Sequence, residues 1–141
     1  QRRFSIEINR TDLVMVDDYA HHPTEIEAVY RAVAQTYPDR RKTVVFQPHL
    51  FTRTRDFAQE FSDALGRFDQ VILLDIYPAR ELPIPGIDKE YLLSLMNHSQ
   101  AVGCSNQELI PLLQEVKPEL LVVLGAGDIG VLAQEIKKNL R

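Results

Sequence analysis

Short apolar runs alternate with longer amphipathic segments along almost the whole chain. The short runs predict strands, because turn-forming or polar residues bound them; they cover residues 3–9, 12–17, 43–47, 70–75, 101–105 and 119–125. The longer segments predict helices, because apolar residues recur at three- and four-residue spacing; they cover residues 23–37, 54–68, 89–97, 106–116 and 128–140. Pro111 lies inside one of these segments, so we expect that helix to bend or to begin later.

The polarity of the strands predicts how they are covered. Residues 3–9 alternate like an edge strand, whereas the runs from residue 43 onward are continuously apolar and should be buried on both faces. Strands of that kind in alternation with helices are typical of a parallel sheet. We therefore predict one α/β domain over residues 1–141. It is a doubly wound, mostly parallel, Rossmann-like sheet of about six strands with helices on both faces.

Composition narrows the possible partners. The formal charge of −4 argues against nucleic acid, and no apolar run approaches the roughly 18 to 20 residues of a membrane span. A single cysteine, Cys104, cannot form an internal disulfide, which fits a reducing cytoplasm. The chain begins "QRRF" without an initiator methionine, so we expect it to be a piece of a longer protein.

The densest ionisable chemistry is "DDYAHHPTEI", residues 17–26, between a predicted strand and a predicted helix. Open parallel sheets bind ligands beyond the carboxyl ends of their strands, so this stretch lies where a site is expected. Pro23 suits the first helical position and restricts His22 to an extended conformation. Because successive side chains of extended chain diverge, we expect His21 to face the site and His22 to cap or pack against the helix.

Further polar segments follow the next strands. "FQPHLFTRTRDF", residues 46–57, contains His49 and Arg53, and arginine suits bidentate contact with carboxylate or phosphate. Arg55 is better interpreted as a surface residue paired with a nearby aspartate. "DIYPARELP", residues 75–83, adds polar candidates; they are Tyr77, Arg80 and Glu81.

"GAGDIG", residues 125–130, matches the dinucleotide-binding pattern G-x-G-x-x-G. It occupies the last strand–helix unit, which leaves no room for a following strand with its ribose-binding acid. We interpret the glycines as a tight turn with close helix packing. Backbone contact with a substrate anion is the alternative.

Together these segments resemble the C-terminal domain of the Mur ligase family. "DDYAHHPTEI", "FQPHLFTRTRDF", "LLDIYPARE" and "GAGDIG" are similar to family motifs in order and approximate spacing. "RRF" resembles the hinge to the central domain, so residues 1–4 would be a remnant of that hinge. The similarity is greatest to members that join L-alanine to UDP-N-acetylmuramate. A related ligase of cell-wall recycling has phenylalanine in place of Tyr19 and is the poorer match.

The resemblance implies an ATP-dependent, amide-forming ligase of peptidoglycan synthesis. ATP would phosphorylate the muramoyl carboxylate and leave as ADP, and the amine of L-alanine would attack the acyl phosphate, with loss of phosphate. The implied partners are UDP-N-acetylmuramate, L-alanine, ATP and the central domain of the same chain. That domain would hold most of the ATP and Mg²⁺ through a G-x-x-x-x-G-K-[ST] loop, which these residues lack. The isolated chain is therefore expected to be inactive.

The resemblance also implies roles for individual residues. Arg3 and Asp18 would bind the nucleotide, and Tyr19, His49 and Arg53 the substrate. His21 would be catalytic, holding a water or accepting a proton from the attacking amine. No metal ligand is expected from this domain. The family often has arginine where this chain has Leu50, so Arg53 or another group must take over its contact.

Two other interpretations remain open at this point. A metal-dependent hydrolase could use Asp17 or Asp18 together with His21 and His49. A non-catalytic nucleotide-binding or interaction module would use the same edge of the sheet without any reaction.

Overall fold

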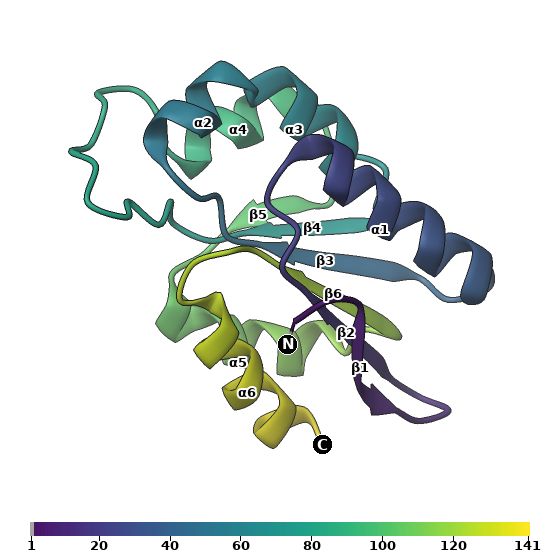
Figure 1. Ribbon diagram of the computed structural model, residues 1–141. Coiled ribbons are helices and arrows are strands. Elements are labelled where there is room, and N and C mark those ends of the chain that lie inside the picture. Colours follow the sequence, from purple (N-terminus) through teal and green to yellow (C-terminus); the bar gives the residue numbers. More distant parts are fainter. Residues whose placement is uncertain (1) are drawn as a thin grey trace.

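A computed structural model describes residues 2–141 as one six-stranded sheet between two layers of helices (Figure 1). The strands are β1 Ser5–Asn9, β2 Val14–Asp18, β3 Lys42–Phe46, β4 Gln70–Leu73, β5 Ala101–Gly103 and β6 Leu120–Leu124. The helices are α1 Pro23–Thr36, α2 Phe51–Asp56, α3 Ala58–Leu65, α4 Lys89–Met96, α5 Asn106–Val116 and α6 Ile129–Leu140. No helix among these residues is long and apolar enough to cross a bilayer.

The strands lie in the order β1-β2-β6-β3-β4-β5. β1 pairs antiparallel with β2, and all other neighbours are parallel. Helices α1 to α4 cover one face and α5 and α6 the other (Figure 1). The predicted doubly wound, mostly parallel sheet, with β1 as its edge strand, is therefore confirmed.

Each face of the sheet has its own apolar core, and the central strands supply both cores. In β6, Leu120, Val122 and Leu124 pack under α1 and α3, whereas Leu121 and Val123 pack against α5 and α6. All five are fully buried. Because each face is covered, every position of such a strand must be apolar, which explains the continuous runs in the sequence.

The parallel strands end in one row across the sheet. Asp18 pairs with Leu124, Leu124 with Phe46, and Phe46 with Leu73. The chain leaves β2 and β3 toward α1 and α2 on one face, but leaves β6 toward α6 on the other. Connections that diverge in this way open a crevice beside β6, which is where this fold class binds ligands.

One detail of the sequence prediction was wrong, and one of the two alternatives for the helix containing Pro111 is excluded. The single helix expected over residues 54–68 is two helices, α2 and α3, which meet at Phe57 in a non-helical conformation (φ −120°, ψ 25°). The helix containing Pro111 does not begin later, since α5 starts at Asn106. Ser105 caps it by accepting from the Glu108 N–H, and the Glu108 carboxylate accepts from the Ser105 N–H. This capping box fixes the start of α5 ahead of the proline.

Candidate functional site

The carboxyl end of β2 contains a buried acid that is paired with an arginine from the start of the chain. Asp17 is only 1% exposed. The guanidinium of Arg2 donates to both of its oxygens, from Nε at 3.1 and 3.0 Å and from Nη2 at 2.8 Å. It also donates to the carbonyl oxygens of Gly125 at 2.7 Å and Asp18 at 3.3 Å. Arg2 therefore joins the start of the chain to the ends of β2 and β6.

Arg3, Asp18 and Tyr19, all predicted site residues, line one pocket of about 200 Å³. The Asp18 carboxylate accepts from the backbone N–H groups of Phe4 and Ala20, each at 2.7 Å. Each of its oxygens keeps a second lone pair, so the carboxylate can also accept from a ligand. Tyr19 is 52% exposed and presents its ring to solvent. The pocket thus combines a cation, an acceptor and an aromatic surface.

His21 lies beside this pocket, at the entrance to α1. Its Nδ1 is 3.0 Å from the Tyr19 carbonyl oxygen, which can only accept, so Nδ1 carries the proton. The Glu25 carboxylate accepts from the backbone N–H groups of His21 at 2.9 Å and His22 at 3.0 Å. Partial burial opposes the charge on Glu25, but these N–H groups outweigh it and lower the pKa of this carboxyl. They also cap α1.

His22 takes the extended conformation that Pro23 demands (φ −116°, ψ 150°). Its ring packs edge-on against Phe57 at 5.9 Å between centroids, consistent with a packing role. The expected divergence of the two histidines was wrong, because their rings lie 5.3 Å apart. The hydrogen bond from His21 to Tyr19 holds the His21 ring back over the turn.

His49 and Arg53 approach from the loop after β3 and from α2. Nη1 of Arg53 is 3.0 Å from Nδ1 of His49. A guanidinium only donates, so this Nδ1 accepts and His49 is the neutral Nε2–H tautomer. Burial, the charge of Arg53 and the neighbouring His21 lower the pKa of His49, and only Glu81 acts in the opposite direction. Arg55, by contrast, is exposed and pairs with Asp56 at 2.9 Å, as expected.

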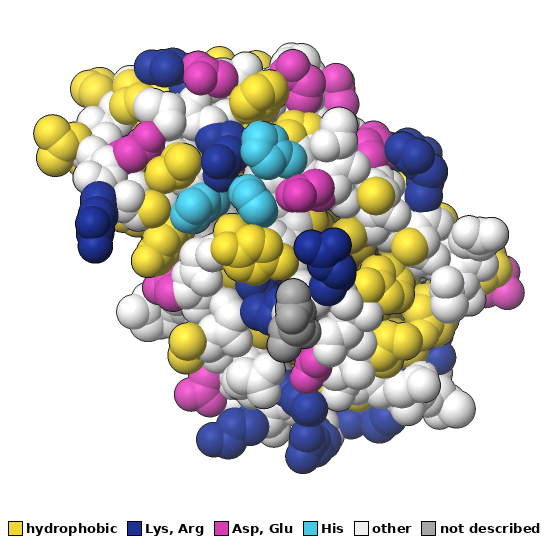
Figure 2. Space-filling view, viewed as in Figure 1, with side chains coloured by type: hydrophobic (Ala, Val, Ile, Leu, Met, Phe, Trp, Pro, Cys, Tyr) yellow, Lys and Arg dark blue, Asp and Glu magenta, His cyan; other side chains and the backbone are white. Residues whose placement is uncertain are grey.

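Three of the four histidines form one cluster on the surface; they are His21, His22 and His49 (Figure 2). The His21 and His49 rings are 6.0 Å apart, and the Tyr19 and His21 rings 5.3 Å apart. The structure therefore brings all the predicted site residues to one edge of the sheet; they are Arg3, Asp18, Tyr19, His21, His49 and Arg53. When Nε2 of His21 carries no proton, it offers an acceptor, and Nε2–H of His49 offers a donor, so the cluster can accept a proton at one ring and bind an anion at the other.

The segment after His49 is strained and held by the loop after β4. Leu50 has a positive φ of 75°, which is rare for a residue with a side chain. Glu81 accepts from the N–H of Phe51 at 2.5 Å and of Thr52 at 3.1 Å, and from the Thr52 hydroxyl. The Thr52 hydroxyl bond in particular lowers the pKa of Glu81. Glu81, a polar candidate from the sequence, thus holds the start of α2 rather than contributing a free carboxylate.

The glycine motif is a packing element, as interpreted. Gly125 has φ 150°, and a Cβ there would lie 2.9 Å from the Ile129 side chain. A Cβ on Gly127 would lie 2.6 Å from both Gln47 and Tyr77. The Gln47 amide binds Asp128 at 2.6 Å and accepts from the Ile129 N–H at 3.2 Å. Protein groups therefore surround this turn.

Sequence reasoning missed several residues that organise the site, namely Arg2, Gln47 and the cap function of Glu81. Arg2 lies next to the expected hinge arginine, Arg3, and Gln47 lies at the end of a predicted strand. Their positions were visible, but their partners lie 15 and 81 residues away. No local pattern links residues at such separations.

Residues 2–141 offer no metal site, because no group of three His, Cys, Asp or Glu side chains there could hold an ion. The grouping of Asp18, His21 and His49 required by a metal-dependent hydrolase is not favoured. The Asp18 carboxylate accepts hydrogen bonds from two backbone N–H groups. The positive charge of Arg53 beside His49 disfavours a bound cation there.

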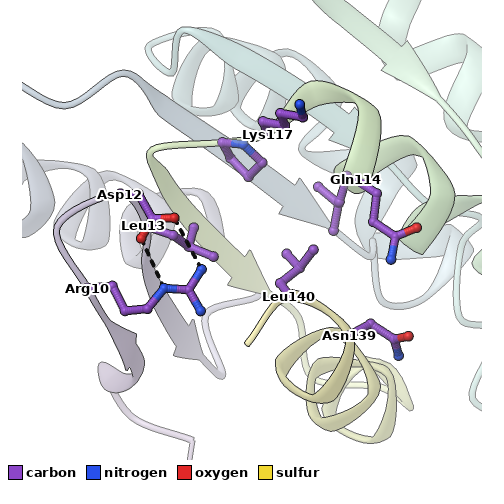
Figure 3. A pocket seen from close by; sticks show the side chains of 9 residues that line it. Arg10, Asp12, Leu13, Gln114, Lys117, Asn139 and Leu140 are labelled. Carbon is purple, nitrogen blue, oxygen red and sulfur yellow. Dashed lines mark hydrogen bonds and ion pairs between the residues drawn. The ribbon is translucent and has the colours of Figure 1, made fainter.

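A larger hollow of about 430 Å³ lies at the opposite edge of the sheet (Figure 3). It is bounded by the β1–β2 turn and the ends of α5 and α6. Arg10 and Asp12 on its rim pair with each other at 3.0 Å. The predicted site residues are not among those that line it, so it has no part in the chemistry described above.

Comparisons with known proteins agree with this geometry. The family model described as "Mur ligase, glutamate ligase domain" matches residues 2–130. The UDP-N-acetylmuramate–L-alanine ligases of Flavobacterium psychrophilum and Christiangramia forsetii are 51% and 49% identical over 140 residues. These alignments cover 99% of this chain and 31% of each relative, so the chain spans about a third of their length.

Solved structures agree on the fold. The UDP-N-acetylmuramate–alanine ligase of Thermotoga maritima matches with a TM-score of 0.73 at 24% identity, over 99% of this chain and 30% of that one. A domain of a putative muramate–peptide ligase from Haemophilus ducreyi matches with a TM-score of 0.69 at 23% identity, over 99% of this chain and 100% of that one. The family match over most of the chain shows that this protein belongs to the Mur ligase family, as its glutamate ligase domain.

Proposed function

We propose that this chain is the C-terminal domain of a cytoplasmic ligase that joins L-alanine to UDP-N-acetylmuramate with cleavage of ATP. The observation that carries the proposal is the continuity of the two clusters on the carboxyl edge. The Arg3–Asp18–Tyr19 pocket meets the histidine cluster where the Tyr19 and His21 rings lie 5.3 Å apart. Relatives 51% and 49% identical carry the name of this activity. The solved muramate–peptide ligase domain, at 23% identity, supports the fold alone.

The pocket suits the nucleotide. Asp18 accepts a hydrogen bond from a ribose hydroxyl through its remaining lone pairs. The exposed Arg3 contacts the nucleotide from the same pocket. ATP, when bound, supplies the phosphoryl group that activates the substrate carboxylate. Residues 2–141 contain no group of three His, Cys, Asp or Glu side chains that could hold Mg²⁺.

The histidine cluster suits the reacting groups. Arg53 and the Nε2–H of His49 bind carboxylate oxygens of the substrate, because both are donors and Arg53 is charged. Tyr19 borders the same substrate with its exposed ring. His21 accepts the proton that the attacking amine releases, at the Nε2 left free by its bond to Tyr19. The Glu25 carboxylate, 3.5 Å from Nδ1 of His21, stabilises the imidazolium that results.

A chimera tests the proposal. This chain replaces the corresponding part of the Flavobacterium psychrophilum ligase, which is 51% identical to it. ADP release is measured with every substrate present and with UDP-N-acetylmuramate or L-alanine left out in turn. Release that needs all substrates supports the proposal. A folded chimera without such release, beside an active parent enzyme, contradicts it.

A further inference from the structure

Tyr77, in the loop after β4, adjoins His49 through both its main chain and its ring. The Leu50 N–H donates to the Tyr77 carbonyl at 2.9 Å, and the Tyr77 N–H donates to the Pro48 carbonyl at 2.8 Å. These two bonds flank His49 and form a small parallel bridge beyond the ends of the strands. The main chain of His49 is therefore fixed to Tyr77 on both sides.

The ring of Tyr77 stacks on the imidazole of His49. Their centroids lie 5.6 Å apart, and their planes differ by only 13°. This distance is in the range of a favourable offset stack. The stack covers one face of the imidazole, while Arg53 occupies its Nδ1 edge at 3.0 Å. The ring is thus held at a face and at an edge, and its Nε2–H remains for a ligand.

Gly127 makes room for this arrangement. A Cβ on Gly127 would lie 2.6 Å from Cγ of Tyr77 and 2.9 Å from its Cβ, closer than such atoms approach in proteins. The second glycine of "GAGDIG" is therefore required by the Tyr77 side chain. Three groups therefore lie in a row between the turn after β6 and the loop after β3. They are the backbone of Gly127, the ring of Tyr77 and the ring of His49.

The strained backbone of Leu50 indicates why the contact between Tyr77 and His49 is needed. A side-chain-bearing residue with φ of 75° persists only where its surroundings hold it. The Tyr77 carbonyl holds the N–H of this residue, directly after His49. We propose that Tyr77 is a positioning residue, whose ring and main chain orient the His49 imidazole so that Nε2–H meets a substrate oxygen. The choice of substrate rests on the proposed function, but the positioning of His49 does not.

An NMR titration of the histidine rings in this chain tests the positioning directly. Residues of this chain form both apolar cores, so the chain itself is the sample. The charged or titratable groups that act on His49 are Arg53, His21 and Glu81, and all three are kept in every variant. Tyr77→Leu removes the stacked ring, Gly127→Ala displaces it, and Tyr77→Phe keeps it.

We expect the pKa of His49 to rise toward its ordinary value in Tyr77→Leu and Gly127→Ala, and to stay unchanged in Tyr77→Phe. The control is Tyr30→Leu on α1, which removes a different aromatic contact, the one with the Phe68 ring at 5.1 Å between centroids. This variant changes stability without moving the His49 titration. An unchanged His49 titration in both Tyr77→Leu and Gly127→Ala overturns the positioning role.

Kinetics of the chimera separate the positioning from the reaction. Tyr77→Leu should lower kcat/KM about tenfold or more, because small misplacements of a binding group are costly. The acidic limb of its pH profile should move together with the His49 pKa. If the NMR titration moves while the kinetics stay unchanged, the claim that the orientation of His49 serves a substrate is overturned. If the chimera fails with wild-type Tyr77, the proposed function is at fault, and the NMR result stands by itself.

Discussion

The guanidinium of Arg2 and the carboxylate of Asp17 form a two-point ion pair in which the acid is 1% exposed. The backbone carbonyl of Arg2 also accepts from the Tyr19 N–H at 2.6 Å. The start of the chain is thereby fixed to the turn that contains the candidate site. In the longer ligase proposed for this chain, any reorientation of this domain would therefore carry Arg2 with the site.

Arg2→Leu should destabilise the chain by about 2 to 5 kcal/mol, because it leaves a buried carboxylate without its partner. Thermal melts check this, and a loss of several degrees or more is expected. Arg3→Leu is the matched control, since Arg3 is the exposed neighbour that lines the pocket. Equal melting temperatures for the two variants would show that the ion pair contributes nothing to stability.

The stability of the chain should fall with acidification in a way that depends on His49. Its pKa is lowered in the fold, so below about pH 6.5 the unfolded chain takes up a proton that the folded chain still refuses. The free energy of unfolding therefore decreases as the pH falls from about 6.5 through the lowered pKa of His49. Glu25 and Glu81, whose pKa values are also lowered, lose their contributions only below about 4.5.

Urea midpoints of wild type and His49→Asn between about pH 5 and pH 8 measure this contribution. The variant should show the shallower dependence on pH. A steeper dependence in the variant would mean that the folded state favours charged His49, against the assignment of its Nδ1 as an acceptor.

His21 and His22 should separate in function although their rings are close. In the chimera, His21→Ala should lower kcat roughly a hundredfold, as the loss of a general base does, with little change in melting temperature. His22→Ala should lose about 1 kcal/mol of stability with its contact to Phe57 and keep most of its activity. Steady-state rates and thermal melts of both variants measure the two effects separately. Equal losses of activity at unchanged stability would assign the two rings a shared role instead.

Arg53→Ala should weaken binding of the substrate carboxylate by about 2 to 5 kcal/mol. The loss is this large because position 50 is leucine and provides no second arginine beside Arg53. Arg55→Ala is the control, since Arg55 lies two residues further along α2 and is paired only at the surface, with Asp56. The measurement is kcat/KM for UDP-N-acetylmuramate in the chimera. A change within about twofold for both variants would make Arg53 a structural residue.

The sequence predicted those parts of the structure that depend on local pattern. Leu120 to Leu124 are apolar at every position because two helix layers cover β6, and that continuity was visible. Pro23 predicted the start of α1 and the extended His22. Most of the predicted site residues lie together because they follow strand ends, where this fold class places its ligands, and their roles stay predictions.

What the sequence did not predict depends on distant partners. The start of α2 is held by Glu81, 30 residues away, and its own segment "FTRTRD" lacks an apolar period. The pairing of Arg2 with Asp17 needs β1 to fold back along β2. The stack of Tyr77 on His49 needs two loops to meet beyond neighbouring strands. No spacing rule within one segment describes such contacts.

The most direct test of the central proposal is the product that the chimera makes. It is incubated with UDP-N-acetylmuramate, ATP, Mg²⁺ and isotope-labelled L-alanine, and the nucleotide fraction is examined by mass spectrometry. We predict a labelled product with the mass of both substrates less one water, and none from this chain alone. A folded chimera that makes no labelled product, beside a parent enzyme that does, would contradict the account.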